Sequence, residues 1–99
     1  MEKNKRIQEI LKNKAWMLFE QPNMRSIEYF ANKDNSRVSI TIYQHTEADI
    51  LHKDLRTRIK FGSSGTMSLS EMDIVMRNLN IAREIAEIWN AEIPTLESN

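Results

Sequence analysis

Apolar residues in the last third of the chain recur at steps of three and four, which predicts one face of an α-helix. From Ser68 to about Ile93 this stripe consists of Met72, Val75, Met76, Leu79, Ala82, Ala86, Trp89 and Ile93. At about 100° per residue, a second apolar set falls on the back of the same helix. That set is Ile74, Ile81, Ile85 and Ile88. One stripe can cover the core of the chain, so the other needs a further element or a second molecule.

A helix is predicted near each end of the chain. Ser68 and Glu71 have the spacing of a capping box, so we expect the last helix to begin there. A first helix is predicted from Lys3 to about Phe19, with its apolar face formed by Ile7, Ile10, Leu11, Ala15, Leu18 and Phe19. Pro22 ends it, because the residue before a proline resists helical geometry.

Three segments alternate between apolar and polar residues, which predicts β-strands. They are Met24–Ala31, Arg37–His45 and Leu55–Phe61, and residues 32–36 between the first two have turn chemistry. Residues 46–54 fit either a helical turn or an irregular loop. The residues expected in the core are Val38, Ile40, Ile42, Leu55, Ile59 and Phe61, covered by Ile10, Leu18, Met72, Leu79 and Trp89.

The predicted fold is therefore α+β, in the order helix-strand-strand-strand-helix. A three-stranded antiparallel sheet buries one face, and two helices packed on that face would cover it. We expect residues 1–99 to form a single domain, since 99 residues are enough for one core, and residues 94–99 to form a short loose tail.

Charge and composition exclude several classes of function and of site. Lysine and arginine together number 14, as do aspartate and glutamate, so net charge gives no strong attraction to nucleic acid or anionic membranes. The sequence has no cysteine, which excludes disulfides, thiolate metal sites and cysteine nucleophiles. No run approaches the roughly 18 apolar residues that span a bilayer, and the N-terminus lacks a signal-peptide core. These features predict a soluble, cytoplasmic protein that has no membrane association.

No motif indicates catalysis, so we expect a non-enzymatic protein without catalytic residues, cofactor or metal. Residues with oxygen or nitrogen ligands do cluster in one segment, namely His45, Glu47, Asp49, His52 and Asp54. Their spacing matches no helix or strand that would bring them together, and a hydrophilic loop is favoured, although metal binding by His45 and His52 stays open. The segment from Gly62 to Gly65 could hold an anion before a helix, but no phosphate-loop lysine follows.

The back stripe of the last helix indicates the function. Contiguous exposed apolar area on a soluble protein marks an interaction site, and a two-fold dimer would bury Ile74, Ile81, Ile85 and Ile88 against their copies. We therefore predict a homo-oligomeric protein-binding module, a small regulator or inhibitor of a larger protein partner in a phage or a bacterium. The alternative is that the first helix covers this stripe. We expect Met72 and Met76 to fill the core.

A second function is nucleic-acid binding on the outer face of the sheet. The residues that would serve it, or contact a protein partner, are Phe30, Tyr43, Arg56, Arg58 and Lys60. Aromatic rings can stack on bases while cations neutralise phosphates. An ordinary solvated face would look similar, and protein binding is the favoured prediction.

Overall fold

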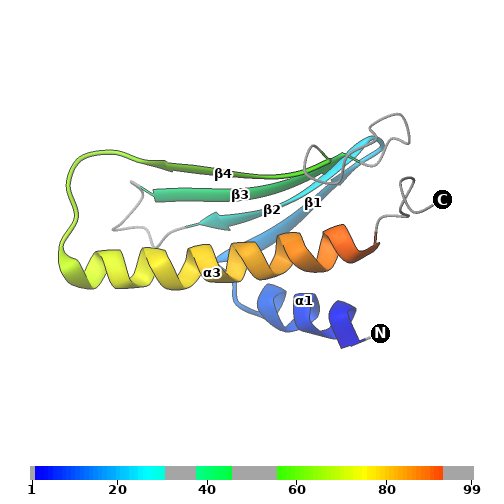
Figure 1. The fold of residues 1–99 in the computed structure, drawn as a ribbon, viewed down its shortest axis with the longest axis horizontal. Coiled ribbons are helices and arrows are strands. Elements are labelled where there is room, and N and C mark those ends of the chain that lie inside the picture. Colours follow the sequence, from blue (N-terminus) through cyan, green and yellow to red (C-terminus); the bar gives the residue numbers. More distant parts are fainter. Residues whose placement is uncertain (1, 31–37, 46–55, 93–99) are drawn as a thin grey trace.

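In the part of the chain that the structure describes, four antiparallel strands form one sheet (Figure 1). The structure is a computed structural model, which describes residues 2–30, 38–45 and 56–92. Its elements follow the order α1 (Glu2–Lys12), β1 (Trp16–Gln21), β2 (Met24–Phe30), β3 (Val38–His45), β4 (Thr57–Ser63) and α3 (Leu69–Glu92). Strands that follow one another in the chain lie side by side in the order β1-β2-β3-β4. The α+β class is confirmed, whereas the prediction of three strands is wrong.

The additional strand, β1, occupies residues that the sequence assigned to the first helix. That helix ends at Lys12, well before Phe19, because Asn13 forms a local turn. The side-chain Oδ1 of Asn13 accepts the N–H of Ala15 at 3.0 Å, and its carbonyl accepts the N–H of Trp16 at 3.0 Å. Such bonds compete with helix continuation, since they satisfy the same backbone groups in another conformation.

Pairing with β2 then stabilises the extended form of β1. A two-residue turn at Pro22 and Asn23 joins the strands, and their register sets Trp16 opposite Tyr29 and Leu18 opposite Ile27. The rings of Trp16 and Tyr29 lie 5.0 Å apart between centroids, a separation at which aromatic pairs attract. Pairing with β2 therefore makes residues 16–21 a strand, although the spacing of their apolar residues fits a helix.

The other strands follow the predicted alternation. Ile27, Ile42 and Ile59 are cross-strand neighbours on the side that faces α3, while Arg58 and Lys60 take the opposite side of β4. The prediction for Leu55, for the ambiguous segment 46–54 and for the tail 94–99 lies outside the described residues.

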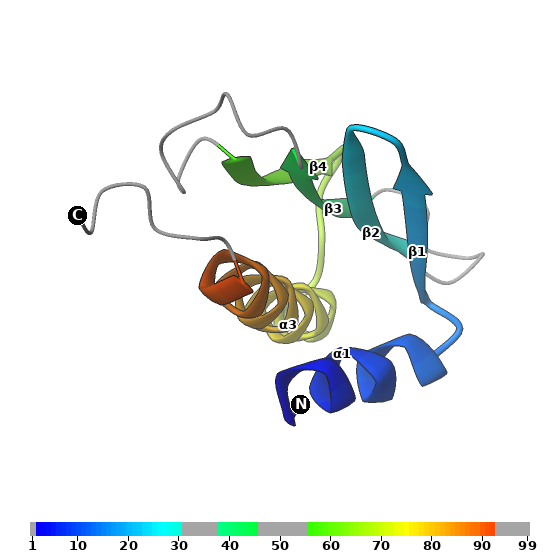
Figure 2. The ribbon, with the colours of Figure 1, turned by 90° about the vertical axis from the view of Figure 1, so that its right-hand side faces the viewer.

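The capping box before α3 is confirmed. The N–H of Glu71 donates to Ser68 Oγ at 3.2 Å, and the N–H of Ser68 donates to Glu71 Oε1 at 2.8 Å. Gly65, just upstream, has a φ of 76°, a conformation that glycine adopts without steric cost. From this start α3 runs along β3 and β4, and α1 lies against β1 and beside the second half of α3 (Figures 1 and 2).

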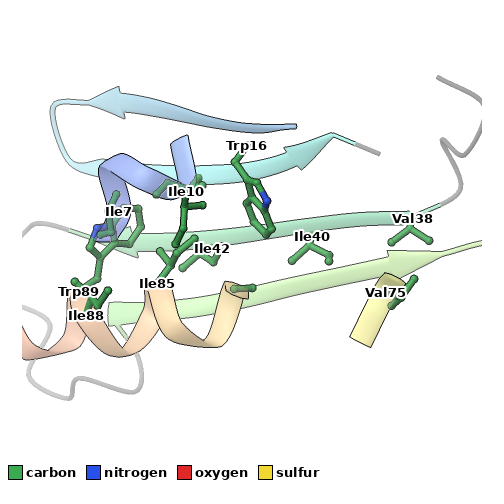
Figure 3. Packing of buried hydrophobic residues seen from close by; sticks show 12 residues of the cluster. Ile7, Ile10, Trp16, Val38, Ile40, Ile42, Val75, Ile85, Ile88 and Trp89 are labelled. Carbon is green, nitrogen blue, oxygen red and sulfur yellow. The ribbon is translucent and has the colours of Figure 1, made fainter. Parts of the chain in front are cut away.

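The core lies between the sheet and the two helices (Figure 3). Its centre is a layer of isoleucines with a tryptophan, and the largest fully buried side chains are Trp89, Ile27, Ile40, Ile42 and Ile85. Each such side chain contributes roughly 1.5–3 kcal/mol through the removal of apolar surface from water. Ile7 and Ile10 of α1 close the same core from the side of β1. None of the helices in the described part of the chain combines the length and apolar character that crossing a bilayer requires.

Candidate functional site

The isoleucine stripe on the back of α3 is mostly buried. Ile85 is 0 % exposed and Ile88 is 9 % exposed, while Ile81 packs at the margin of the core. The expectation that these three side chains lie bare is therefore wrong, and Ile74 alone among the four is exposed. The cause is the position of α1, which packs beside the second half of α3 and covers the side that the sheet leaves open (Figure 2).

A charged pair fixes α1 in this position. The Arg6 guanidinium binds the Glu84 carboxylate through two hydrogen bonds, Nε to Oε2 at 2.6 Å and Nη2 to Oε1 at 2.9 Å. Hydrogen bonding to Arg6 holds the pKa of Glu84 below its ordinary value, and the same bond raises the pKa of Arg6. This two-pronged geometry gives more directional control than a single contact and so sets how α1 lies on α3.

The first half of α3 is different, because α1 does not extend alongside it (Figure 1). Met72 is 47 % exposed and Met76 is 56 % exposed, so the expectation that both fill the core is wrong. Leu69 and Ile74 of the same half are exposed as well. Only Val75 in this half is fully packed against the sheet.

Strand β4 carries two further exposed apolar side chains, of which Ile59 pairs with Ile42 and so lies level with Ile85 in the second half of α3 (Figure 3). Ile59 and Phe61 point to the side of the sheet that carries α3, yet they are 42 % and 45 % exposed. The expectation that both belong to the core is therefore wrong. At about 100° per residue, Met72 and Met76 project roughly 140–180° away from Ile81. Since Ile81 packs on the side of α1, the two methionines face the other side, where β4 is the edge strand (Figure 2).

We call this surface the apolar flank, defined as Ile59, Phe61, Met72 and Met76. Isolated exposed apolar residues are common, but several long ones on adjoining elements are typical of interaction sites. Methionine suits such a site because its unbranched, polarizable side chain adapts to differently shaped partners. The chemistry of the apolar flank is that of non-covalent association with another apolar surface.

The open face of the sheet brings together most of the residues predicted to contact nucleic acid. The register places Tyr43 beside Arg58 and Thr41 beside Lys60, and Phe30 lies on the same face. Arg56 is the exception, and the expectation that it lies exposed on this face is wrong. The residue is 9 % exposed, and its Nε donates to the His45 carbonyl at 3.2 Å. A side chain buried to this extent has little surface with which to contact a phosphate.

Sequence reasoning missed two residues of this open face, Met17 and Phe19 of β1. Both are exposed, and the Phe19 ring lies edge-on to Phe30 with 6.4 Å between centroids. They were missed because the run from Trp16 to Phe19 is uniformly apolar and fits a helical face. The signal for a strand was the two-residue turn at Pro22 and Asn23, followed directly by alternation.

A polar cluster at the far end of α3 also escaped prediction. Arg25 lies 4.3 Å from the Trp89 ring centroid and donates to Gln44 Oε1 and to Glu92 Oε1, both at 2.7 Å. Gln44 Nε2 donates in turn to Thr57 Oγ1 at 3.2 Å and to the Trp89 carbonyl at 3.1 Å. These bonds tie the last turn of α3 to three strands, and their mutual satisfaction indicates a structural role.

Of the histidine and carboxylate cluster, only His45 is described, and the predictions for Glu47, Asp49, His52 and Asp54 lie outside the described residues. Among the residues with a described placement, no three His, Cys, Asp or Glu side chains gather as metal ligands would. Comparisons of the chain with protein-family models, with curated proteins and with solved structures found no significant match.

Proposed function

We propose that this chain is a non-enzymatic protein-binding module that docks its partner on the apolar flank. The observation that carries the proposal is the exposure of four long apolar side chains on two adjoining elements, Met72 and Met76 of α3 and Ile59 and Phe61 of β4. Burying such side chains against an apolar helix or loop of a partner would remove their surface from water, at roughly 25 cal/mol per Å². A small regulator or inhibitor of a larger protein would act through a surface of this kind.

If the self-association predicted from the sequence used α3, it would have to use this same surface. Because Ile81, Ile85 and Ile88 belong to the core, a second copy would have to use the first half of the helix. In that arrangement Ile74 and Met76 would contact the copy, and self-association and partner binding would compete for the same residues.

Site-specific photo-crosslinking in native cells tests partner binding. Benzoylphenylalanine at position 61 or 76 should give one recurrent crosslinked protein, whereas the same group at the exposed Gln8 of α1 should not. Adding Met72→Glu to the position-61 variant should abolish the crosslink, because a carboxylate cannot enter an apolar interface without a partner. Equal crosslinking from positions 8 and 61, or no loss with Met72→Glu in a folded protein, would contradict the proposal.

The second candidate function is nucleic-acid binding on the open face of the sheet. It is favoured by one observation, the placement of Tyr43 and Phe30 on the same face as Arg58 and Lys60. Fluorescence anisotropy with a labelled single-stranded oligonucleotide should then show binding that weakens with salt. Replacing Arg58 and Lys60 by Ala should weaken it about tenfold and flatten the salt dependence, while an unchanged affinity would dismiss this function.

A further inference from the structure

We propose that β1 pairs with β1 of a second copy, so that two sheets join into one continuous antiparallel sheet across a two-fold axis. This inference goes beyond the proposed function, because it uses the opposite edge of the sheet from the apolar flank. Three features of β1 support it: the direction of its backbone groups, its unprotected apolar sequence, and the fit of the strand to its own copy.

The backbone groups of β1 point alternately to β2 and to the open edge. Phe30 N–H donates to the Ala15 carbonyl at 2.6 Å, which makes Ala15 and Phe30 a hydrogen-bonded pair of the antiparallel ladder. Alternation then turns Met17 and Phe19 toward β2, and turns Leu18 and Glu20 outward. The outward N–H groups of Leu18 and Glu20 have no partner among the described residues, and the N–H of Trp16 is used by Asn13.

The edge at β1 lacks the features that usually prevent pairing. Natural edge strands carry lysine, proline or inward charges, since bare edges pair with other chains. Strand β4, at the other edge, has Arg58 and Lys60 along it. Strand β1 instead reads Trp-Met-Leu-Phe before its first charge, and Met17, Leu18 and Phe19 are all exposed. Its edge therefore offers both hydrogen bonds and apolar surface.

One register satisfies both the hydrogen bonds and the side chains. When Leu18 lies opposite Leu18 of the copy, Leu18 N–H donates to the Leu18 carbonyl and Glu20 N–H to the Trp16 carbonyl, in both directions. Met17 then faces Phe19 of the copy in a non-hydrogen-bonded pair, where side chains approach most closely.

Side-chain pairing favours this register over the two centred further along the strand, at Phe19 and at Glu20. Moving the centre to Phe19 places Leu18 opposite Glu20 and Met17 opposite Gln21, so apolar groups face polar ones. Moving it to Glu20 sets two carboxylates opposite each other, which is repulsive. The register centred on Leu18 separates the two Glu20 side chains and keeps the helix-facing side chains of both copies on one side of the joined sheet.

Charge reversal at position 18 tests this register by sedimentation equilibrium. Leu18→Lys places two ammonium groups opposite each other and should weaken wild-type dimerisation about tenfold or more, as should Leu18→Glu. An equimolar mixture of the two variants should restore association, because Lys then faces Glu. The matched control is Met67→Lys, at a similarly exposed apolar position (36 % against 40 %) outside both β1 and the apolar flank, which should leave dimerisation unchanged.

Amide exchange in the wild-type protein gives a test that needs no variant. As protein concentration rises, the amides of Leu18 and Glu20 should become protected, while those of Met17 and Phe19 are protected throughout. A single-chain mass at millimolar concentration would overturn the proposal. So would unchanged dimerisation of folded Leu18→Lys, or dimerisation lost through Met72→Glu and Met76→Glu instead, which would assign self-association to the apolar flank.

Discussion

At the residue scale, position along α3 decides whether an isoleucine is core or surface. Ile74 and Ile85 lie at similar angles around the helix axis, since they differ by eleven residues and thus by about three full turns. Yet Ile74 is exposed and Ile85 is fully buried. The difference arises because Ile85 lies where α1 and the sheet meet, whereas Ile74 precedes the part of α3 that α1 covers.

Truncation of these two isoleucines should therefore have very different effects. We expect Ile85→Ala to lower the free energy of unfolding by about 2–5 kcal/mol, because it leaves a cavity in the packed core. The matched change Ile74→Ala should cost less than about 1 kcal/mol. Urea denaturation followed by circular dichroism measures both, and equal losses would show that α1 does not cover the second half of α3.

At the element scale, sequence alone predicted three of the four strands and the start of α3. Alternation in β2, β3 and β4 and the pair Ser68 and Glu71 are local patterns, so a single sequence reveals them. The strand β1 was not predicted, because its apolar run is ambiguous until β2 is available to pair with it. Likewise, the burial of Ile81 and Ile88 depends on the docking of α1, and the exposure of Met76 depends on β4 being the edge strand of the sheet.

The docking of α1 should depend on pH through Glu84. Because the pKa of Glu84 is lowered in the folded protein, its contribution is present above the ordinary carboxyl pKa and is lost as pH falls through the folded value. We expect Glu84→Gln to cost about 0.5 kcal/mol near pH 7, a small effect because solvent screens this partly exposed pair.

Urea unfolding of both proteins across the acidic range measures this effect. The difference between wild type and Glu84→Gln should shrink as the pH falls below about 4.3, the ordinary glutamate value. A difference that stays constant down to about pH 2 would mean that the pair with Arg6 does not stabilise the fold.

At the scale of the whole molecule, the layers differ in how firmly they are held. Strands β2 and β3 have a neighbour on each side and carry Ile27, Ile40 and Ile42, whereas α1 is held mainly by Ile7, Ile10 and Arg6. Regions with fewer buried contacts open at lower free energy than the global transition. The molecule should therefore lose α1 before it loses the sheet.

Native-state hydrogen exchange measures this order. The amides of β3 should exchange only through global unfolding, and those of α1 should exchange at least about tenfold faster. Arg6→Ala should accelerate exchange in α1 and leave β3 unchanged, with Lys12→Ala as the control on an exposed position of the same helix. Identical protection in α1 and β3 would show that the two unfold as one unit.

The order of the strands in the sheet also affects how the protein folds while it is being synthesised. Each strand pairs with the one synthesised just before it, so the ladders close short loops and can form early. The helix that shields Ile40 and Ile42 is translated only after all four strands. A nascent chain thus passes through a stage in which the sheet is formed but its apolar face is exposed to solvent. At this stage the chain is most open to binding by chaperones and to misassembly.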